Sequence, residues 1–224
     1  MSRVPWRVGK VISIETRDGI FVLAQMIQDP YIVFFNVFND SHNWPSTELE
    51  SIPVLYIAGV TRQFVSKSNV KYLKHIDAVT VDQPKAWIHP NQDFVYRTIW
   101  TELPIELTVC YYGDHGGSLI ERDITAPDFA SFNNSERVIV EVLPSGNFDA
   151  IEGYELTTLR TFPHENERLY LCYLFKKNVD PEKELMFDLP LPHEYHRYMS
   201  MSEVPPDVLE SVKEIVRVDP LGSV

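Results

Sequence analysis

Three short apolar runs fill most of the first forty residues, and turn signals separate them. The runs cover residues 8–16, 20–27 and 31–38. Asp18-Gly19 is a strong hairpin signal, and Asp29-Pro30 separates the second run from the third. Because the second and third runs are almost continuously apolar, we expect a β-meander. Its strands are either covered on both faces or curled into a tight small barrel.

Further strand-like runs follow along the rest of the chain. They cover residues 54–60, 94–101, 105–112, 118–125, 137–143 and 169–176, and a short run over 86–90 ends at a proline. Residues 62–76 and 154–162 fit either a helix or strands. Residues 178–206 are rich in proline and charge, and we expect them to cover the surface as an extended segment.

One helix stands out at the end of the chain. Pro205-Pro206 suits a helix start, and an apolar stripe follows at Val208, Leu209, Val212, Ile215 and Val216. The whole pattern predicts an α+β fold that is mainly antiparallel β, as a meander or partly open barrel, with a C-terminal helix.

The strongest loop signal, residues 113–117, coincides with a change in charge density. Residues 1–112 contain 10 Lys and Arg against 11 Asp and Glu, whereas residues 113–224 contain 10 against 21. We therefore expect a β module over 1–112 and an acidic β-rich region with the C-terminal helix over 113–224. The alternative is that both parts form a single domain.

The net charge of the chain also excludes some classes of binding partner. All 224 residues together carry a formal net charge of −12, which repels phosphate backbones and argues against nucleic-acid binding. An acidic half suits a basic partner, although acidic surfaces also simply keep proteins soluble and monomeric.

Cysteine usage and the N-terminus point to the cytoplasm. The N-terminus lacks the apolar core of a signal peptide, and polar residues interrupt the most apolar stretch, so we expect no membrane association. Cys110 and Cys172 each lie in a strand-like run, which predicts two buried free thiols in a reducing compartment, with a disulfide between them as the alternative.

Candidate chemistry is sparse. His193 and His196 are three residues apart rather than the four of the zinc protease motif, so we expect no metal site. Asp114 and His115 in the glycine-rich loop could act as orienter and base of a hydrolase, although a plain hairpin loop is the simpler interpretation. Phosphate-binding glycine motifs are absent from the sequence, and we expect no cofactor.

The N-terminal pattern resembles a known family. Residues 8–14 (VGKVISI), 18–27 (DGIFVLAQMI) and 31–38 (YIVFFNVF) are similar to the opening of the immunity protein 26 family. Its members are small β-rich proteins encoded beside bacterial toxins, and they are thought to neutralise the cognate toxin by binding it. The resemblance covers roughly the first 85 to 110 residues. It brings no catalytic residues, because the family has none.

The resemblance implies a toxin inhibitor rather than an enzyme. We expect its partner to be a cognate protein toxin, with a nuclease that has a basic cleft as one candidate. The expected contacts are Trp44 as an aromatic anchor and the carboxylates of Asp114, Glu121, Asp123, Asp128, Glu152, Glu155, Glu165 and Glu167. Each expected contact has a simpler alternative: Trp44 folds back onto the core, and the carboxylate pairs only solvate the surface. For the chain as a whole, the alternative to a toxin inhibitor is an adaptor subunit or the hydrolase named above.

Overall fold

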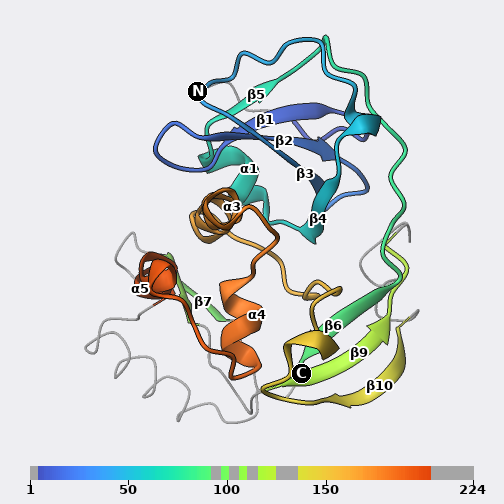
Figure 1. Cartoon of the computed structure of the whole chain (residues 1–224), viewed down its shortest axis with the longest axis vertical. Helices are drawn as coiled ribbons and strands as arrows, with labels where there is room; N and C mark the ends of the chain where they lie inside the picture. The colour runs from blue at the N-terminus through green and yellow to red at the C-terminus, as the bar shows by residue number, and fades with distance from the viewer. Residues whose placement is uncertain (1–4, 92–96, 101–105, 110–115, 125–135, 203–224) are drawn as a thin grey trace.

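The structure is a computed structural model that describes residues 5–91, 97–100, 106–109, 116–124 and 136–202. Its described strands form three antiparallel sheets (Figure 1). The largest has five strands in the order β4-β3-β2-β1-β5, the second has the order β10-β9-β6, and β7 pairs with β8. The fold is therefore α+β and mainly antiparallel, as predicted. The five-stranded sheet is open and not a closed barrel.

The five-stranded sheet takes its strands from the first third of the chain, and the second sheet comes from the middle. The strands are β1 (Val11–Glu15), β2 (Phe21–Met26), β3 (Tyr31–Asn39), β4 (Val54–Gly59), β5 (Val70–Tyr72), β6 (Ala86–Pro90), β7 (Arg97–Trp100), β8 (Glu106–Val109), β9 (Gly117–Glu121) and β10 (Arg137–Leu143). The helices are α1 (Arg62–Lys67), α3 (His164–Phe175), α4 (Pro181–Met186) and α5 (His196–Ser202), with short 3-10 turns η1 (Leu49–Ser51), η2 (Phe148–Ala150) and η3 (His193–Tyr195).

The first hairpin forms where its sequence predicts. Asp18 and Gly19 both have positive φ angles, 53° and 73°, and the Ile20 amide donates to the Arg17 carbonyl at 3.0 Å. Positive φ at both central residues matches the right-handed twist of the flanking strands, and glycine adopts it without steric cost. Strands β1 and β2 then pair along their full length.

Both faces of the five-stranded sheet are covered, which selects the first of the two expected arrangements. One face packs Ile12, Val22 and Phe34 against α3 and residues 195–198, and the opposite face packs Leu23 and Val33 against other segments. Alternate residues of one strand point to opposite faces, so a strand covered twice needs apolar residues throughout. This explains why β2 shows no polar alternation.

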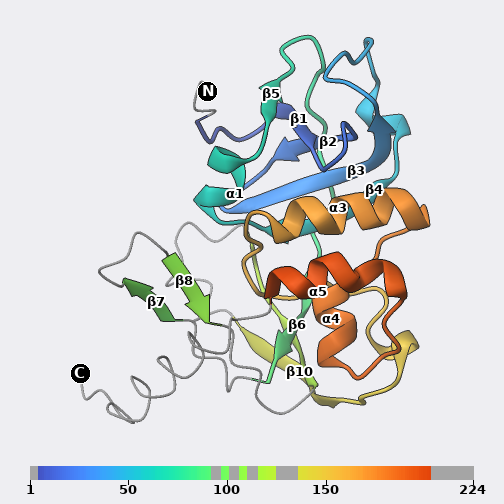
Figure 2. The same ribbon diagram turned by 90° about the vertical axis from the view of Figure 1, so that its left-hand side faces the viewer.

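Helix α3 occupies a segment for which we predicted a strand over 169–176. It lies across one face of the large sheet, with α5 and α4 farther from the sheet (Figure 2). Its buried positions are Glu165, Asn166, Glu167, Arg168, Leu169, Leu171 and Cys172, so more than one side of the helix is covered. The prediction was wrong because four of these seven buried positions are polar or charged, so the apolar residues alone show no helical period.

The expected extended surface segment over 178–206 is also wrong in its described part. Pro181 begins α4 at the first helical position, and the Asp180 side chain caps that helix. Phe187 is fully buried, and Tyr195 is nearly so. The proline that suggested an extended chain therefore starts a helix instead. The predicted helix over residues 205–216 lies outside the described residues.

Two segments fitted either a helix or strands in the sequence, residues 62–76 and 154–162, and the structure resolves each of them differently. Residues 62–76 contain both α1 and β5. Residues 154–162 are largely extended and connect the two main sheets, because Leu156 bridges Ile88 of β6 and Arg160 bridges Val60 just beyond β4. Backbone bonds of 2.9 Å and 2.8 Å support these bridges.

Core residues come from both sides of residue 112, where we expected a module boundary. Trp87 packs in the same cluster as Ile120, and Ile12 packs in the same cluster as Leu169. Strand β6 also pairs with β9 across this position. The described parts of the two halves thus share their cores, an arrangement typical of the single-domain alternative.

Trp44 folds back onto the sheet rather than standing out as an anchor. Its side chain is only 8% exposed, and its Nε1 donates to the Ser13 hydroxyl at 2.8 Å. Ser13 Oγ also lies 2.9 Å from His42 Nδ1. Trp44 therefore closes the core beneath residues 39–53, and we no longer assign it to a partner surface.

Replacing Ser13 with alanine tests this packing. Ser13→Ala leaves the buried Trp44 N–H without its acceptor, so we expect the free energy of unfolding to fall by about 1–3 kcal/mol. Urea denaturation followed by tryptophan fluorescence measures the loss. Ser46→Ala, at an exposed position of the same loop, is the control and should change stability by less than about 0.5 kcal/mol. Equal stability of both variants would contradict the role of Ser13.

Candidate functional site

Four consecutive polar residues in the first half of α3 are buried. Glu165, Asn166, Glu167 and Arg168 are between 0% and 6% exposed. Each contacts a different part of the chain, because successive helical residues point about 100° apart. The Tyr56 hydroxyl of β4 donates to Glu165 at 2.8 Å, Asn166 donates to the Glu15 carbonyl at 2.7 Å, and Arg17 pairs with Glu167 at 3.0 Å.

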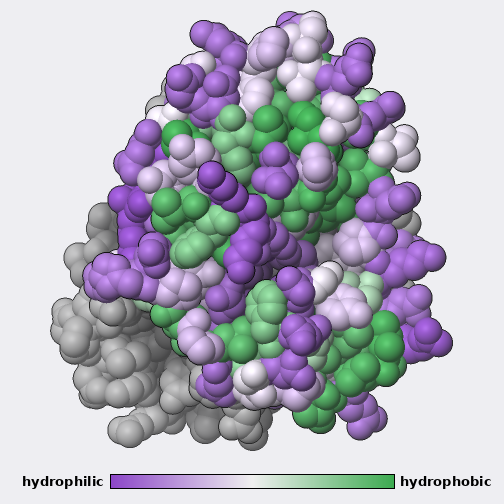
Figure 3. Space-filling model, viewed as in Figure 1, coloured by the Kyte–Doolittle hydropathy of each residue, from purple (hydrophilic) through white to green (hydrophobic). Residues whose placement is uncertain are grey.

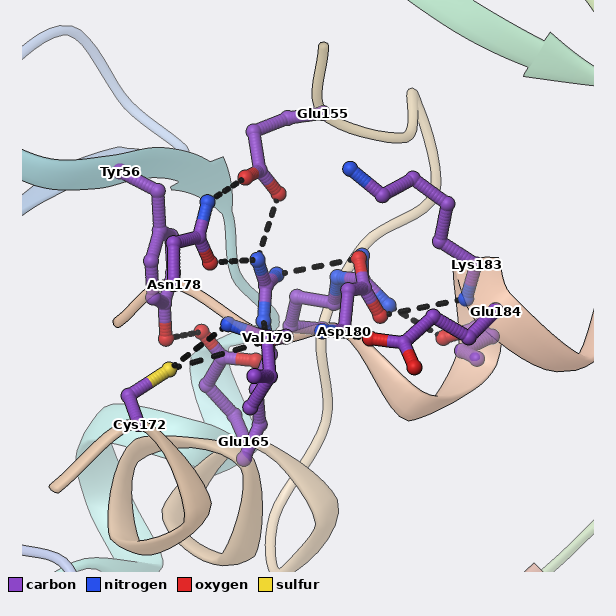
Figure 4. A network of polar contacts seen from close by, with 12 residues as sticks. Tyr56, Glu155, Glu165, Cys172, Asn178, Val179, Asp180, Lys183 and Glu184 are labelled. Atoms are coloured by element: carbon purple, nitrogen blue, oxygen red, sulfur yellow. Dashed lines mark hydrogen bonds and ion pairs between the residues drawn. The ribbon is translucent and has the colours of Figure 1, made fainter. Parts of the chain in front are cut away.

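Arg168 contacts several members of a larger polar network, of which Figure 4 labels Glu155, Asn178, Val179 and Asp180. Its Nε donates to the Val179 carbonyl at 2.9 Å, and its Nη2 donates to Glu155 at 2.7 Å and to Asn178 at 3.0 Å. The guanidinium also lies over the Tyr56 ring, 3.8 Å from its centroid. Arginine suits this position because its planar group can stack and donate several hydrogen bonds at once.

A second buried arginine completes the network. Arg160 pairs with both Asp180 and Glu182, and Asp180 also faces Arg168 at 3.4 Å. The other Asp180 oxygen accepts from the Lys183 amide at 3.3 Å and so caps α4. Lys183 Nζ in turn donates to the carbonyls of Tyr154 and Ile151. Asp180 thus pairs with two arginines and also caps the N-terminus of α4.

The network shifts the pKa values of its buried carboxylates in opposite directions. Burial alone would raise the pKa of Asp180, but the charges of Arg160, Arg168 and Lys183 together hold it below its ordinary value. Burial raises the pKa of Glu165, and the two arginines offset only part of that effect. Of these two carboxylates, Asp180 is the one whose charged form the folded state favours.

This network is built to hold the fold rather than to turn over a substrate. Arg160, Arg168, Glu165 and Asp180 are each at most 3% exposed, so no ligand from solvent reaches them in this conformation. The nearby Cys172 is a free, buried thiol, as predicted, although it lies in a helix and not in a strand. Burial raises its pKa to about 12, which keeps it protonated and therefore weakly nucleophilic.

Several expected partner contacts belong to this interior. We expected Glu155, Glu165 and Glu167 at a toxin-facing surface or on solvated faces. Instead, the side chains of Glu165 and Glu167 are 1% and 3% exposed, and that of Glu155 is 10% exposed and paired with Arg168. These three are removed from the candidate surface, because pairing and burial leave them little area to offer a partner.

Two expected contacts, Glu121 and Asp123, come together at the surface. They line a cavity of about 650 Å³ at the end of β9. Its full lining is Val81, Asp82, Gln83, Pro84, Lys85, Glu121, Arg122, Asp123 and Ile124. Glu152 is exposed after η2, and Asp114, His115, Asp128 and Cys110 lie outside the described residues. Asp82 could not be predicted as a site residue, because no local signal in the sequence joins residue 82 to residues 121–124 before β6 and β9 pair.

Arg122 has its own partners within this cavity. Its Nε donates to Glu136 at 2.8 Å, and its Nη1 reaches the Thr157 carbonyl at 3.4 Å. Glu121 pairs with Arg137 across the strands at 2.8 Å, and both side chains remain substantially exposed. The cavity is thus lined by three carboxylates and two cations, one of which is already neutralised by Glu136.

A family model described as a domain of unknown function, DUF8309, matches residues 1–190. The chain belongs to the DUF8309 family. The matched DUF8309 region includes both main sheets, α3 and α4, so one family unit contains the buried network and the cavity. No curated protein and no solved structure matches the chain.

Two further findings concern the described part of this DUF8309 chain. Within it, His, Cys, Asp and Glu side chains form no group of three that could hold a metal ion. His193 and His196 are exposed, with stacked rings 6.4 Å apart between centroids. Among the same residues, no helix has both the length and the apolar character to cross a membrane.

Removing the charge of Asp180 tests the network. Asp180→Asn leaves two buried guanidinium groups with one counter-charge fewer, and we expect a loss of about 3 kcal/mol or more at neutral pH. Urea unfolding measures this loss. Asp149→Asn, at an exposed position, is the matched control and should change stability by less than about 0.5 kcal/mol.

The pH dependence of that loss has a defined sign. Because the folded state lowers the pKa of Asp180, its charge contributes stability that is fully present above the unfolded pKa of about 3.9. The contribution disappears as the pH falls through the folded pKa. The difference between wild type and Asp180→Asn should therefore stay constant near neutral pH and shrink below about pH 4. A difference that grows in acid would contradict this assignment.

Proposed function

We propose that this DUF8309 protein is an immunity protein that binds and neutralises a cognate bacterial toxin domain in the cytoplasm. The observation that carries the proposal is the gathering of Asp82, Glu121 and Asp123 around one surface cavity. The resemblance of the first strands to the immunity protein 26 family supplies the class of partner. In this proposal the chain acts by occlusion and not by catalysis.

The cavity suits a basic side chain of a partner. Its volume of about 650 Å³ is ample for the end of a lysine or arginine side chain. The lining holds three carboxylates together with two cations, Lys85 and the Arg122 that Glu136 engages, and Arg137 pairs with Glu121 beside it. A basic protein surface would therefore be attracted toward this face and held by charge-assisted hydrogen bonds.

Because of the buried network, the charge around the cavity is a better guide to a partner surface than the net charge of the whole chain. Four acidic residues contribute to the acidity of the chain but are paired with arginines, namely Glu155, Glu167, Asp180 and Glu182. Their fields are largely cancelled by those cations. The surface carboxylates around the cavity are then better candidates for steering a toxin with a basic cleft, such as a nuclease.

The test of the function begins with the coding region next to this one. We expect a large neighbouring reading frame that ends in a toxin domain. Expression of that domain should arrest growth, and co-expression of the present chain should restore it while forming a stable complex. A toxin that remains active despite co-expression, with no complex detected, would overturn the proposed function. Stable copurification with another protein instead would indicate an adaptor subunit.

Charge-neutralising substitutions test the cavity separately. The double variant Glu121→Gln with Asp123→Asn should bind the toxin domain about tenfold more weakly at low salt, and its affinity should fall less steeply as salt rises. Isothermal titration calorimetry at several salt concentrations measures both effects. Glu50→Gln, at an exposed residue of η1, is the matched control. Unchanged affinity of the double variant would show that the toxin binds at another surface.

A further inference from the structure

Strand β10 is an outer strand with an unusual amount of exposed apolar surface. Val138, Ile139, Val140 and Val142 are 54%, 49%, 40% and 76% exposed. In Figure 3 hydrophobic residues gather at the lower right, in the region of β9 and β10. Natural proteins usually protect such an edge with charges or prolines, because an open strand edge can pair with another chain.

The pairing with β9 explains why so many side chains face outward. β10 has seven residues against five in β9, and the register shifts between Val138 and Val140 and again between Val140 and Leu143. Such irregularities break the strict alternation of a strand. Neighbouring apolar residues of β10 therefore remain accessible together instead of dividing between a buried face and a solvated face.

We propose that β10 pairs with β10 of a second copy, antiparallel about a two-fold axis at Ile139. The sequence of the strand is self-complementary about that position, since Arg137 of one copy faces Glu141 of the other and Val138 likewise faces Val140. An isologous interface repeats each contact, so the Arg–Glu pair occurs twice. Opposite charges and β-branched pairs directly across two antiparallel strands stabilise their association.

The self-complementary pattern favours a second copy over an unrelated partner. An unrelated protein would need no particular relation between positions 137 and 141 of this chain. Both side chains are exposed and available, because Arg137 is 76% exposed even while it contacts Glu121. Two-fold pairing also covers the β10 edge of both copies, so it yields a closed dimer and not a fibre.

Sedimentation equilibrium of the full chain, over a range of protein concentrations, tests this interface without any toxin. We expect a reversible dimer. If the chain does not dimerise, the proposed toxin binding is unaffected, because it does not depend on β10 pairing. Ile139→Lys places two like charges at the axis and should weaken dimerisation by about tenfold or more. Leu174→Lys, on α3 with a similar 45% exposure, is the control and should leave the dimer intact.

Charge reversal at position 137 or 141 of the strand gives the sharpest result. Arg137→Glu and Glu141→Arg should each weaken self-association, because every Arg–Glu pair becomes a pair of like charges. An equimolar mixture of the two variants should dimerise again, since the all-acidic strand of one variant then faces the all-basic strand of the other. Far-ultraviolet circular dichroism verifies that both variants are folded. A monomeric wild type, or a mixture that associates no better than its components, would overturn the proposed interface.

Discussion

The buried contact between Arg168 and its partners is the interaction on which the rest of the fold depends. The guanidinium lies against Tyr56 of the large sheet and at the same time holds Glu155 and Asp180. Glu155 is the residue whose carbonyl accepts from Ile88 of β6. One side chain therefore links the five-stranded sheet, the three-stranded sheet and the start of α4. Charges this deeply buried are tolerated only where each finds its counter-charges and hydrogen bonds.

This constraint changes how the acidity of the chain is understood. The acidic second half suggested an open negative face, yet some of its carboxylates point inward and neutralise Arg160, Arg168 and Arg17. Among the surface carboxylates of the described residues, Glu121 and Asp123 share a cavity with Asp82. Net charge is therefore a weak guide to a binding surface, whereas the placement of each carboxylate is a strong one.

The two proposed surfaces meet on the small sheet but differ in chemistry. The cavity is lined by ionisable groups and suits a basic partner, whereas β10 presents apolar side chains framed by one arginine and one glutamate. Glu121 belongs to the cavity and also contacts Arg137 of β10. The small sheet would thus carry both recognition and self-association, while the large sheet and α3 form the support behind it.

The sequence by itself determined the local structure. The Asp18-Gly19 hairpin, the apolar strands that follow and the boundaries of β10 could be predicted, because each depends on residues close together in the chain. Only the tertiary structure decided that α3 is a helix with a charged buried face and that Asp82 joins Glu121. Tyr56 and Glu165, or Arg17 and Glu167, are more than a hundred residues apart. Whether a charged residue is buried depends on partners that the fold alone brings into contact, so no local pattern could reveal it.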